Sequence, residues 1–166
     1  MRLEEERAFD AFLDVYWEAI HAIERSLLGR IRVAVGHALG WDDAPNSRAI
    51  PGCTERLVAE RLDASDRGRN RFARAEPSPL PVAKVSPVYR FEDEVLYEVS
   101  NATVHALMHI SCAPGAAAEL AIYVKSRGLL TRLYMAAIAP ARYAIVYPAL
   151  VSQVERRWRR ARPGVA

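Results

Sequence analysis

The feature that most constrains this chain is its last third, where an apolar stretch is interrupted by charges and prolines. The stretch over residues 129–151 is long enough and apolar enough to resemble a membrane-spanning helix. However, Arg132 and Arg142 lie within the stretch, and charged groups are costly in the hydrocarbon of a bilayer. Pro140 and Pro148 disrupt the backbone pairing that lipid requires. We therefore predict no transmembrane span, but amphipathic helices that cover another part of the protein.

The N-terminal segment over residues 3–40 carries the spacing of an amphipathic helix. Its apolar residues recur at steps of three and four; they are Phe9, Phe12, Leu13, Tyr16, Ile20, Ile23, Leu27, Ile31, Val35 and Leu39. The pattern predicts one long helix or two in series, with Gly29 and Gly36 as candidate interruptions. Residues 42–81 are rich in turn formers and arginine, so we predict a loop there with a short helix over 54–62.

From residue 82 to 126 the pattern changes to period two, which is typical of strands with two different faces. The candidate strands are VYRFED, EVLYEVS, TVHALMHISC and AELAIYVK, with Pro87 at a strand start or a bulge. Helical patterning returns over 128–160. We expect a single domain over 1–166 of the α+β class, in which an antiparallel meander packs against long N-terminal and C-terminal helices.

The charge and the cysteine content indicate a cytoplasmic protein that does not bind nucleic acid. The net charge is only +3, and arginines of the last helix supply much of the excess, where they complement the helix dipole. Cys53 and Cys112 form no metal-type pair, and no apolar leader follows Met1. The sequence contains no phosphate loop or dinucleotide fingerprint, so we expect neither a metal nor a cofactor.

One predicted hairpin gathers histidines and glutamates on a single face. A turn centred on residues 100–103 places Glu98 opposite His105 and Glu94 opposite His109. The other pairs in this register are Leu96–Leu107 on the same face and, on the opposite face, Val99–Val104, Tyr97–Ala106 and Val95–Met108. One face of the hairpin is therefore polar at two points, and the other is almost wholly apolar.

These pairs support different hypotheses depending on which face looks inward. On a strand His105 and His109 lie roughly 13 Å apart, too far to share a metal ion. If their face lines a cavity, the candidate catalytic residues are His105, His109, Glu94 and Glu98, with each glutamate orienting a histidine base. If it faces solvent, the same pairs are ordinary cross-strand contacts. The connection before the last strand leaves both arrangements open.

Two blocks of the sequence resemble a known family. PVYRFEDEVLYEVSNATVHALMHI and AIYVKSRGLLTRLYMAAIAPARYAIVYPAL are similar to an uncharacterised bacterial family related to the SRPBCC, or START-like, polyketide cyclase-like helix-grip superfamily. The resemblance runs over about 17–158 and implies a sheet curved around a C-terminal helix, with a hydrophobic cavity between them. Helix-grip domains usually open with a strand, whereas this chain opens with a helical pattern.

We therefore expect the protein to bind a small hydrophobic molecule, such as a lipid or a polyketide, between the sheet and the C-terminal helix. The candidate ligand-binding residues are Tyr97, Met108, Tyr134, Ile138, Arg142, Tyr143 and Tyr147. One alternative is an enzyme of the cyclase, lyase or hydrolase type with a Glu–His base. A second is an interaction module, either a homodimer or a protein that contacts the membrane surface through its apolar helices.

Overall fold

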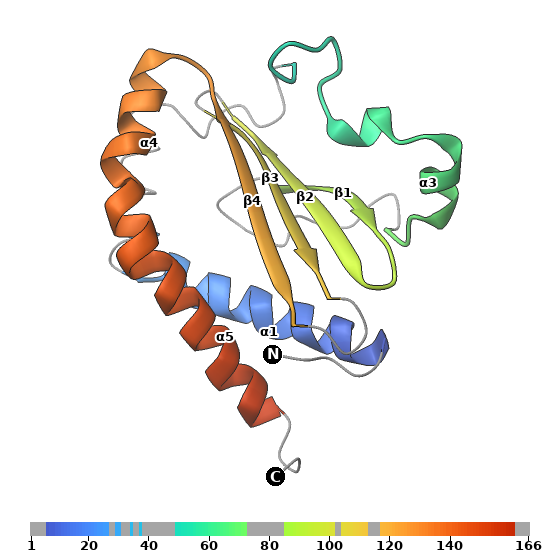
Figure 1. Ribbon diagram of the computed structural model, residues 1–166, viewed down its shortest axis with the longest axis vertical. Coiled ribbons are helices and arrows are strands. Elements are labelled where there is room, and N and C mark those ends of the chain that lie inside the picture. The colour runs from blue at the N-terminus through green and yellow to red at the C-terminus, as the bar shows by residue number, and fades with distance from the viewer. Residues whose placement is uncertain are drawn as a thin grey trace.

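Helices lie at both ends of the chain and a sheet lies between them (Figure 1). The computed structural model describes residues 6–26, 29–30, 34, 37, 49–72, 85–101, 104–112 and 117–161. Its elements are α1 (Glu6–Glu24), the 3-10 helix η1 (Val58–Arg61), α3 (Ala64–Arg69), β1 (Val85–Arg90), β2 (Glu94–Ser100), β3 (Val104–Ser111), β4 (Glu119–Ser126), α4 (Leu129–Ala141), the π-helix η2 (Arg142–Val146) and α5 (Tyr147–Ala161). The predicted α+β class is confirmed, and the arrangement is consistent with a helix-grip-like fold.

The N-terminal helix ends before either predicted glycine. α1 stops at Glu24, and a turn at Arg25 and Ser26 follows. The backbone N–H of Gly29 donates a hydrogen bond to Ser26 Oγ at 3.3 Å, so Ser26 caps the helical residues that come next. The two-in-series alternative is therefore correct for the described residues, but a serine cap rather than glycine marks the boundary.

The predicted loop before the sheet contains more helix than expected. The short helix is η1, which begins at Val58 rather than Thr54, because Thr54 bonds the neighbouring Glu55 carboxylate instead of capping a helix. α3 was not predicted; Asp63 caps it by accepting from the backbone N–H of Asp66 at 2.8 Å. The parts of the predicted loop over 42–48 and 73–81 lie outside the described residues.

The four strands form one antiparallel meander in the order β1-β2-β3-β4. A bulge between Pro87 and Tyr89 shifts the pairing of β1 with β2, as expected for a residue that lacks a backbone donor. The pairing of β3 with β4 shows which face of the sheet carries the apolar residues of β4, a question that the sequence left open. Ile110 pairs with Leu120, which places Leu120 and Ile122 on the same face as Met108.

The register predicted for the β2–β3 hairpin is wrong by two residues. Glu98 pairs with Leu107, and Ser100 pairs with His105. The cause is the turn: Asn101 and Val104 close the hairpin through their backbones, and the Asn101 side chain also accepts from the Val104 N–H at 2.9 Å. Because strand side chains alternate with period two, a shift of two residues leaves every residue on its predicted face.

The C-terminal helices form one continuous bent rod rather than pieces separated by proline. Gly128 precedes α4 with a φ of 125°, a conformation that favours glycine. Pro140 lies inside α4, and the π-helix η2 follows it. Pro148 lies in the first turn of α5, where a missing N–H is tolerated. Between the two prolines a π-helical turn absorbs the irregularity, so the chain stays helical from Leu129 to Ala161.

The main core lies between the sheet and the two long helices. α1 and α5 pack on the sheet face that carries Val95, Tyr97 and Ile110, which we call the core face. Phe12 of α1 meets Trp158 of α5 edge to face at 5.9 Å. We call the opposite face, with Glu94, Leu96 and Glu98 of β2 and His105, Leu107 and His109 of β3, the Glu–His face.

Candidate functional site

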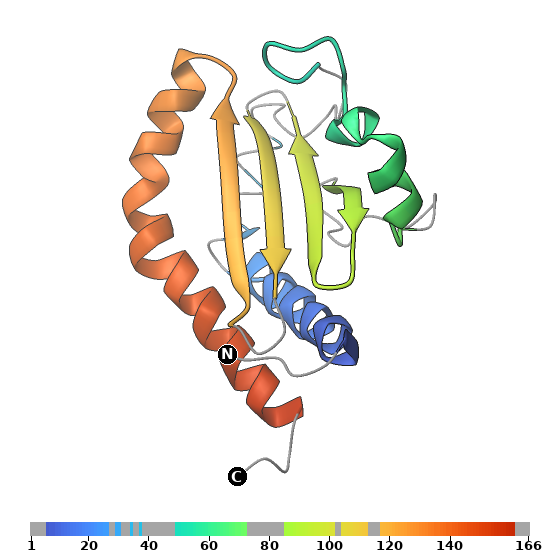
Figure 2. The same cartoon turned by 45° about the vertical axis from the view of Figure 1, so that its right-hand side comes forward.

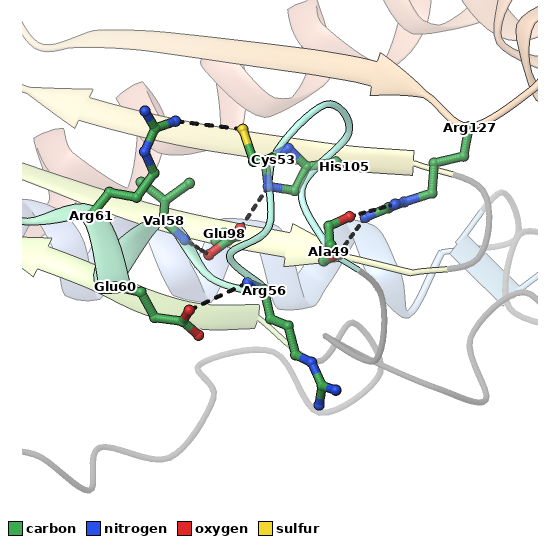
Figure 3. Close-up of polar contacts among 10 residues, drawn as sticks. Ala49, Cys53, Arg56, Val58, Glu60, Arg61, Glu98, His105 and Arg127 are labelled. Atoms are coloured by element: carbon green, nitrogen blue, oxygen red, sulfur yellow. Dashed lines mark hydrogen bonds and ion pairs between the residues drawn. The ribbon is translucent and has the colours of Figure 1, made fainter.

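The segment over 49–62 crosses the Glu–His face of the sheet (Figure 3). At the β4 side, Arg127 donates to the carbonyl of Ala49 at 2.9 Å, and Lys125 donates to the carbonyl of Pro51 at 3.2 Å. At the β2 side, the backbone N–H of Val58 donates to Glu98 Oε2 at 2.9 Å. At this end the Glu–His face is therefore covered, because the segment over 49–62, which we call the strap, is hydrogen-bonded over it.

Beneath this strap, Glu98 and His105 form a buried pair. Glu98 Oε1 lies 2.6 Å from His105 Nε2, and the two residues are 0% and 7% exposed. They contact diagonally across the hairpin, since the turn shifts the register by two residues. Both carboxylate oxygens of Glu98 are occupied, one by His105 and one by the Val58 N–H. Burial of a carboxylate requires such partners, so the pair holds the strap onto the sheet.

The second pair, Glu94 with His109, has the same chemistry at the other end of the hairpin. Glu94 Oε2 lies 2.8 Å from His109 Nε2, and the side chains are 32% and 25% exposed. Glu94 also contributes to a raised pKa of Tyr89, which reaches about 12 mainly through burial. The structure brings both predicted pairs together, but in two separate environments that do not form one site.

Arg127 is a site residue that the sequence did not reveal. Its guanidinium donates to the Ala49 carbonyl and to Ser100 Oγ, both at 2.9 Å. Ser100 is almost fully buried at the end of β2. Arg127 therefore joins the strap to the hairpin beside Glu98 and His105 (Figure 3). No local pattern marks an arginine before a helix-opening glycine as a bridge between two other segments.

On the core face, two of the predicted ligand-binding residues belong to different environments. Tyr97 is buried against Trp17, whose ring lies 5.0 Å away edge to face, so it forms part of the core. Met108 is half-buried, and its sulfur accepts a hydrogen bond from the Tyr16 hydroxyl at 3.2 Å. Burial, with smaller contributions from Tyr97 and Tyr147, raises the pKa of Tyr16 far above its usual value. The Tyr16 phenol is therefore a neutral donor.

The remaining candidates lie on the C-terminal rod. Arg142 is half-buried and donates to the Tyr147 hydroxyl at 2.6 Å, while Tyr143 lies edge to face with Tyr147 at 5.4 Å. Tyr134 and Ile138 are half-buried on α4. Among the described residues, Arg142 contacts neutral groups, namely Tyr147 and the Met135 sulfur. A half-buried cation is thus surrounded by phenolic and apolar side chains.

The core face is well covered at β2 but open at β4. Val95, Tyr97 and Ile110 are buried, whereas Leu120, Ile122 and Val124 on the same face are 37–38% exposed. We call these three β4 residues the open strip. Beside them, the rod exposes Leu129, Leu133, Tyr143 and Ile145. An apolar strand face and an apolar helix therefore lie near each other with much of their surface uncovered (Figure 2).

The rod also meets the length and composition criteria for crossing a membrane. The stretch Thr131–Ala161 is the one such helix among the described residues, and little of it is buried. Core helices of water-soluble proteins meet the same criteria. Within the described part of the chain, no group of three or more His, Cys, Asp or Glu side chains is placed to hold a metal ion. Cys53 and Cys112 are not disulfide-bonded.

Comparison with known proteins identifies the family of the chain. No curated protein and no solved structure matches it. A family described as "Protein of unknown function (DUF2867)" matches residues 7–149, which include α1, the strap, the whole sheet and most of the rod. The chain therefore belongs to the DUF2867 family.

Proposed function

We propose that the protein binds a small hydrophobic molecule, such as a lipid or a polyketide-like metabolite, between the open strip of β4 and the rod. One observation carries this proposal: Leu120, Ile122 and Val124 lie on the core face but stay exposed, although the same face is sealed at β2. Transfer of an apolar molecule from water onto such a surface is favourable by about 25 cal/mol for each Å² of apolar area buried.

The polar groups on the rod and on α1 favour a ligand with an apolar body and one polar end. Arg142 and Tyr147 are hydrogen-bonded to each other, and Tyr147 lies near enough to Tyr16 to raise its pKa. Tyr16 in turn donates to Met108 on the core face. A carboxylate or a phenolate on the ligand would be attracted to the Arg142 guanidinium, which lacks an acidic partner among the described residues.

Two features favour binding over catalysis by the Glu–His pairs. Glu98 has both oxygens bonded and is covered by the strap, so it acts as a structural tie. Glu94 and His109 lie on the face opposite to the open strip, away from the proposed ligand.

We also infer a distant relationship with the SRPBCC superfamily, supported by the order of meander and C-terminal helix. The cytoplasmic location stays a prediction, and Cys53 and Cys112, which form no disulfide, fit the usual state of cysteines there.

A binding titration with a matched pair of variants tests this function. The probe is a fluorescent long-chain fatty acid, added to the full chain. Ile122→Ser should weaken binding by about tenfold or more, because it removes most of an apolar side chain from the ligand surface. Tyr123→Ser changes the next residue, which is exposed on the other face of β4, and should weaken binding much less than Ile122→Ser does. Equal losses in both variants, or no binding to the wild-type chain, would contradict the proposal.

Native mass spectrometry of the purified chain supplies the second readout. A co-purified molecule should appear as a fixed mass increment on the wild-type protein and should be depleted in Ile122→Ser. Arg142→Met keeps an apolar chain of similar length but removes the charge, so it should lower the affinity for the fatty acid more than for its methyl ester. An equal effect on both probes would remove Arg142 from the proposed site.

A further inference from the structure

The two edge strands of the sheet differ in whether their outward backbone groups are hydrogen-bonded. At the β1 edge, the Arg71 N–H donates to the Arg90 carbonyl at 2.8 Å, and the Asn70 side chain bonds both Val88 and Arg90. At the β4 edge, no described residue bonds the outward backbone groups. An exposed apolar strand with a free edge is a ready template for pairing with another chain.

We propose that this edge joins two copies of the chain, with β4 pairing antiparallel to the β4 of the partner around a two-fold axis at Ile122. The strand sequence ELAIYVKS is self-complementary in this register. Glu119 falls opposite Lys125 of the partner subunit, Leu120 opposite Val124 of the partner subunit, and Ala121 opposite Tyr123 of the partner subunit. Both ends thus form ion pairs, and the centre carries no charge.

A register slipped by one residue loses this match. Leu120 would then lie opposite Lys125 of the partner subunit, and Glu119 would lie opposite Ser126 of the partner subunit. The proposed register also keeps the two faces separate. Glu119 and Lys125 share the Glu–His face, while Leu120, Ile122 and Val124 share the core face, so the open strips of the two copies join into one apolar surface.

The position of the rod fits this arrangement. α4 lies beyond β4, on the side away from β3, in both views (Figures 1 and 2). α5 packs against α1 in the layer on the core face. A two-fold axis at Ile122 would bring α4 and η2 of one copy beside the β4 of the other, and the exposed Leu133 of α4 and Ile145 of η2 are the residues that we propose to meet the partner's open strip. Each copy would close the proposed ligand surface of the other.

A second copy fits the free edge better than a lipid surface does. Backbone N–H and C=O groups at an open strand edge have no partners in hydrocarbon, whereas a second β4 supplies all of them. The charges of Glu119 and Lys125 find opposite charges in the dimer but not in an uncharged apolar phase. The observations therefore favour self-association over insertion into a membrane.

The test measures molar mass by light scattering across a dilution series of the full chain. The wild-type chain should be a dimer. Lys125→Glu turns two attractive pairs into two repulsive ones and should raise the dimer Kd by roughly 10- to 30-fold. The double variant Glu119→Lys with Lys125→Glu restores opposite charges and should recover the wild-type Kd. Because the double variant also lacks the Lys125 bond to Pro51, its recovery separates dimer pairing from that contact.

A disulfide trap tests the register itself. Ile122→Cys should form a disulfide-linked dimer under mild oxidation, since residue 122 faces its own copy on the axis, whereas the wild-type chain with Cys53 and Cys112 should not. A wild-type monomer at all concentrations, a dimer indifferent to charge reversal, or a monomer that sediments with phosphatidylcholine vesicles would each overturn the proposal.

Discussion

The two Glu–His pairs of the hairpin are the same two residue types in the same geometry, yet the fold uses them differently. Glu98 with His105 is buried under the strap, and Glu94 with His109 is partly exposed to solvent. The difference arises from what covers each pair, because the strands themselves are alike. In the buried pair every polar atom needs a protein partner, so the Val58 N–H becomes essential; at the exposed pair, water serves equally well.

The largest expected effect is that of removing the buried carboxylate. Glu98→Ala leaves His105 and the Val58 N–H without their partner and should lower the free energy of unfolding by about 3 kcal/mol. Urea denaturation followed by circular dichroism measures the loss. Glu98→Gln retains one acceptor and the side-chain volume, so it should cost less than the alanine variant. Equal stability of Glu98→Ala and the wild type would show that the strap does not depend on this tie.

The next effect isolates the Val58 N–H, which bonds the strap to Glu98. Val58 is the first residue of η1, a position that accepts proline, and Leu57 before it is already extended. Val58→Pro should therefore remove the bond to Glu98 with little other strain and cost about 1.5–3 kcal/mol. Val58→Ala is the matched control, since it trims the side chain but keeps the N–H. A larger loss in the alanine variant would indicate that packing, not this bond, secures η1.

A much smaller effect is expected at the exposed pair. Glu94→Ala should change the free energy of unfolding by less than about 1 kcal/mol, because the side chain is a third exposed and solvent replaces His109 as its partner. Denaturation under the conditions used for Glu98→Ala gives the comparison directly. If the two alanine variants were equally destabilised, burial would not be the property that separates the pairs.

The smallest expected effect is a change in the pKa of Tyr89, which lies next to the exposed pair. Burial first, then Glu94 and Asp66, raise the pKa of Tyr89 from 10.0 to about 12. A raised pKa in the folded state means that the stability contributed by neutral Tyr89 is fully present below pH 10 and is lost as the pH rises toward 12. Glu94→Gln should lower this pKa only slightly, since burial dominates. Ultraviolet titration of the phenolate, with Tyr89→Phe to assign the signal, measures the change.

Much of the fold follows from periodicity that the sequence shows directly. The three-four spacing of Phe9, Phe12 and Tyr16 defines α1 and its buried face, and the alternation of Glu94 and Glu98 with Val95 and Tyr97 defines β2 and its two faces. Both patterns are local, so they do not depend on how the elements meet. The two Glu–His pairs followed from the same alternation, and they survived an error in the hairpin register because that error was an even number of residues.

What the sequence alone determined, then, is which residues share a face: the alternation and the helical spacing depend only on backbone geometry. Only the tertiary structure decided which face is covered and by what. The strap lies over Glu98 and His105 through contacts with Val58 and Arg127, which are distant in the chain. The rod leaves the open strip of β4 exposed, although its sequence predicts amphipathic helices that cover another part of the protein. Such contacts depend on chain-distant partners and packing, which no local pattern encodes.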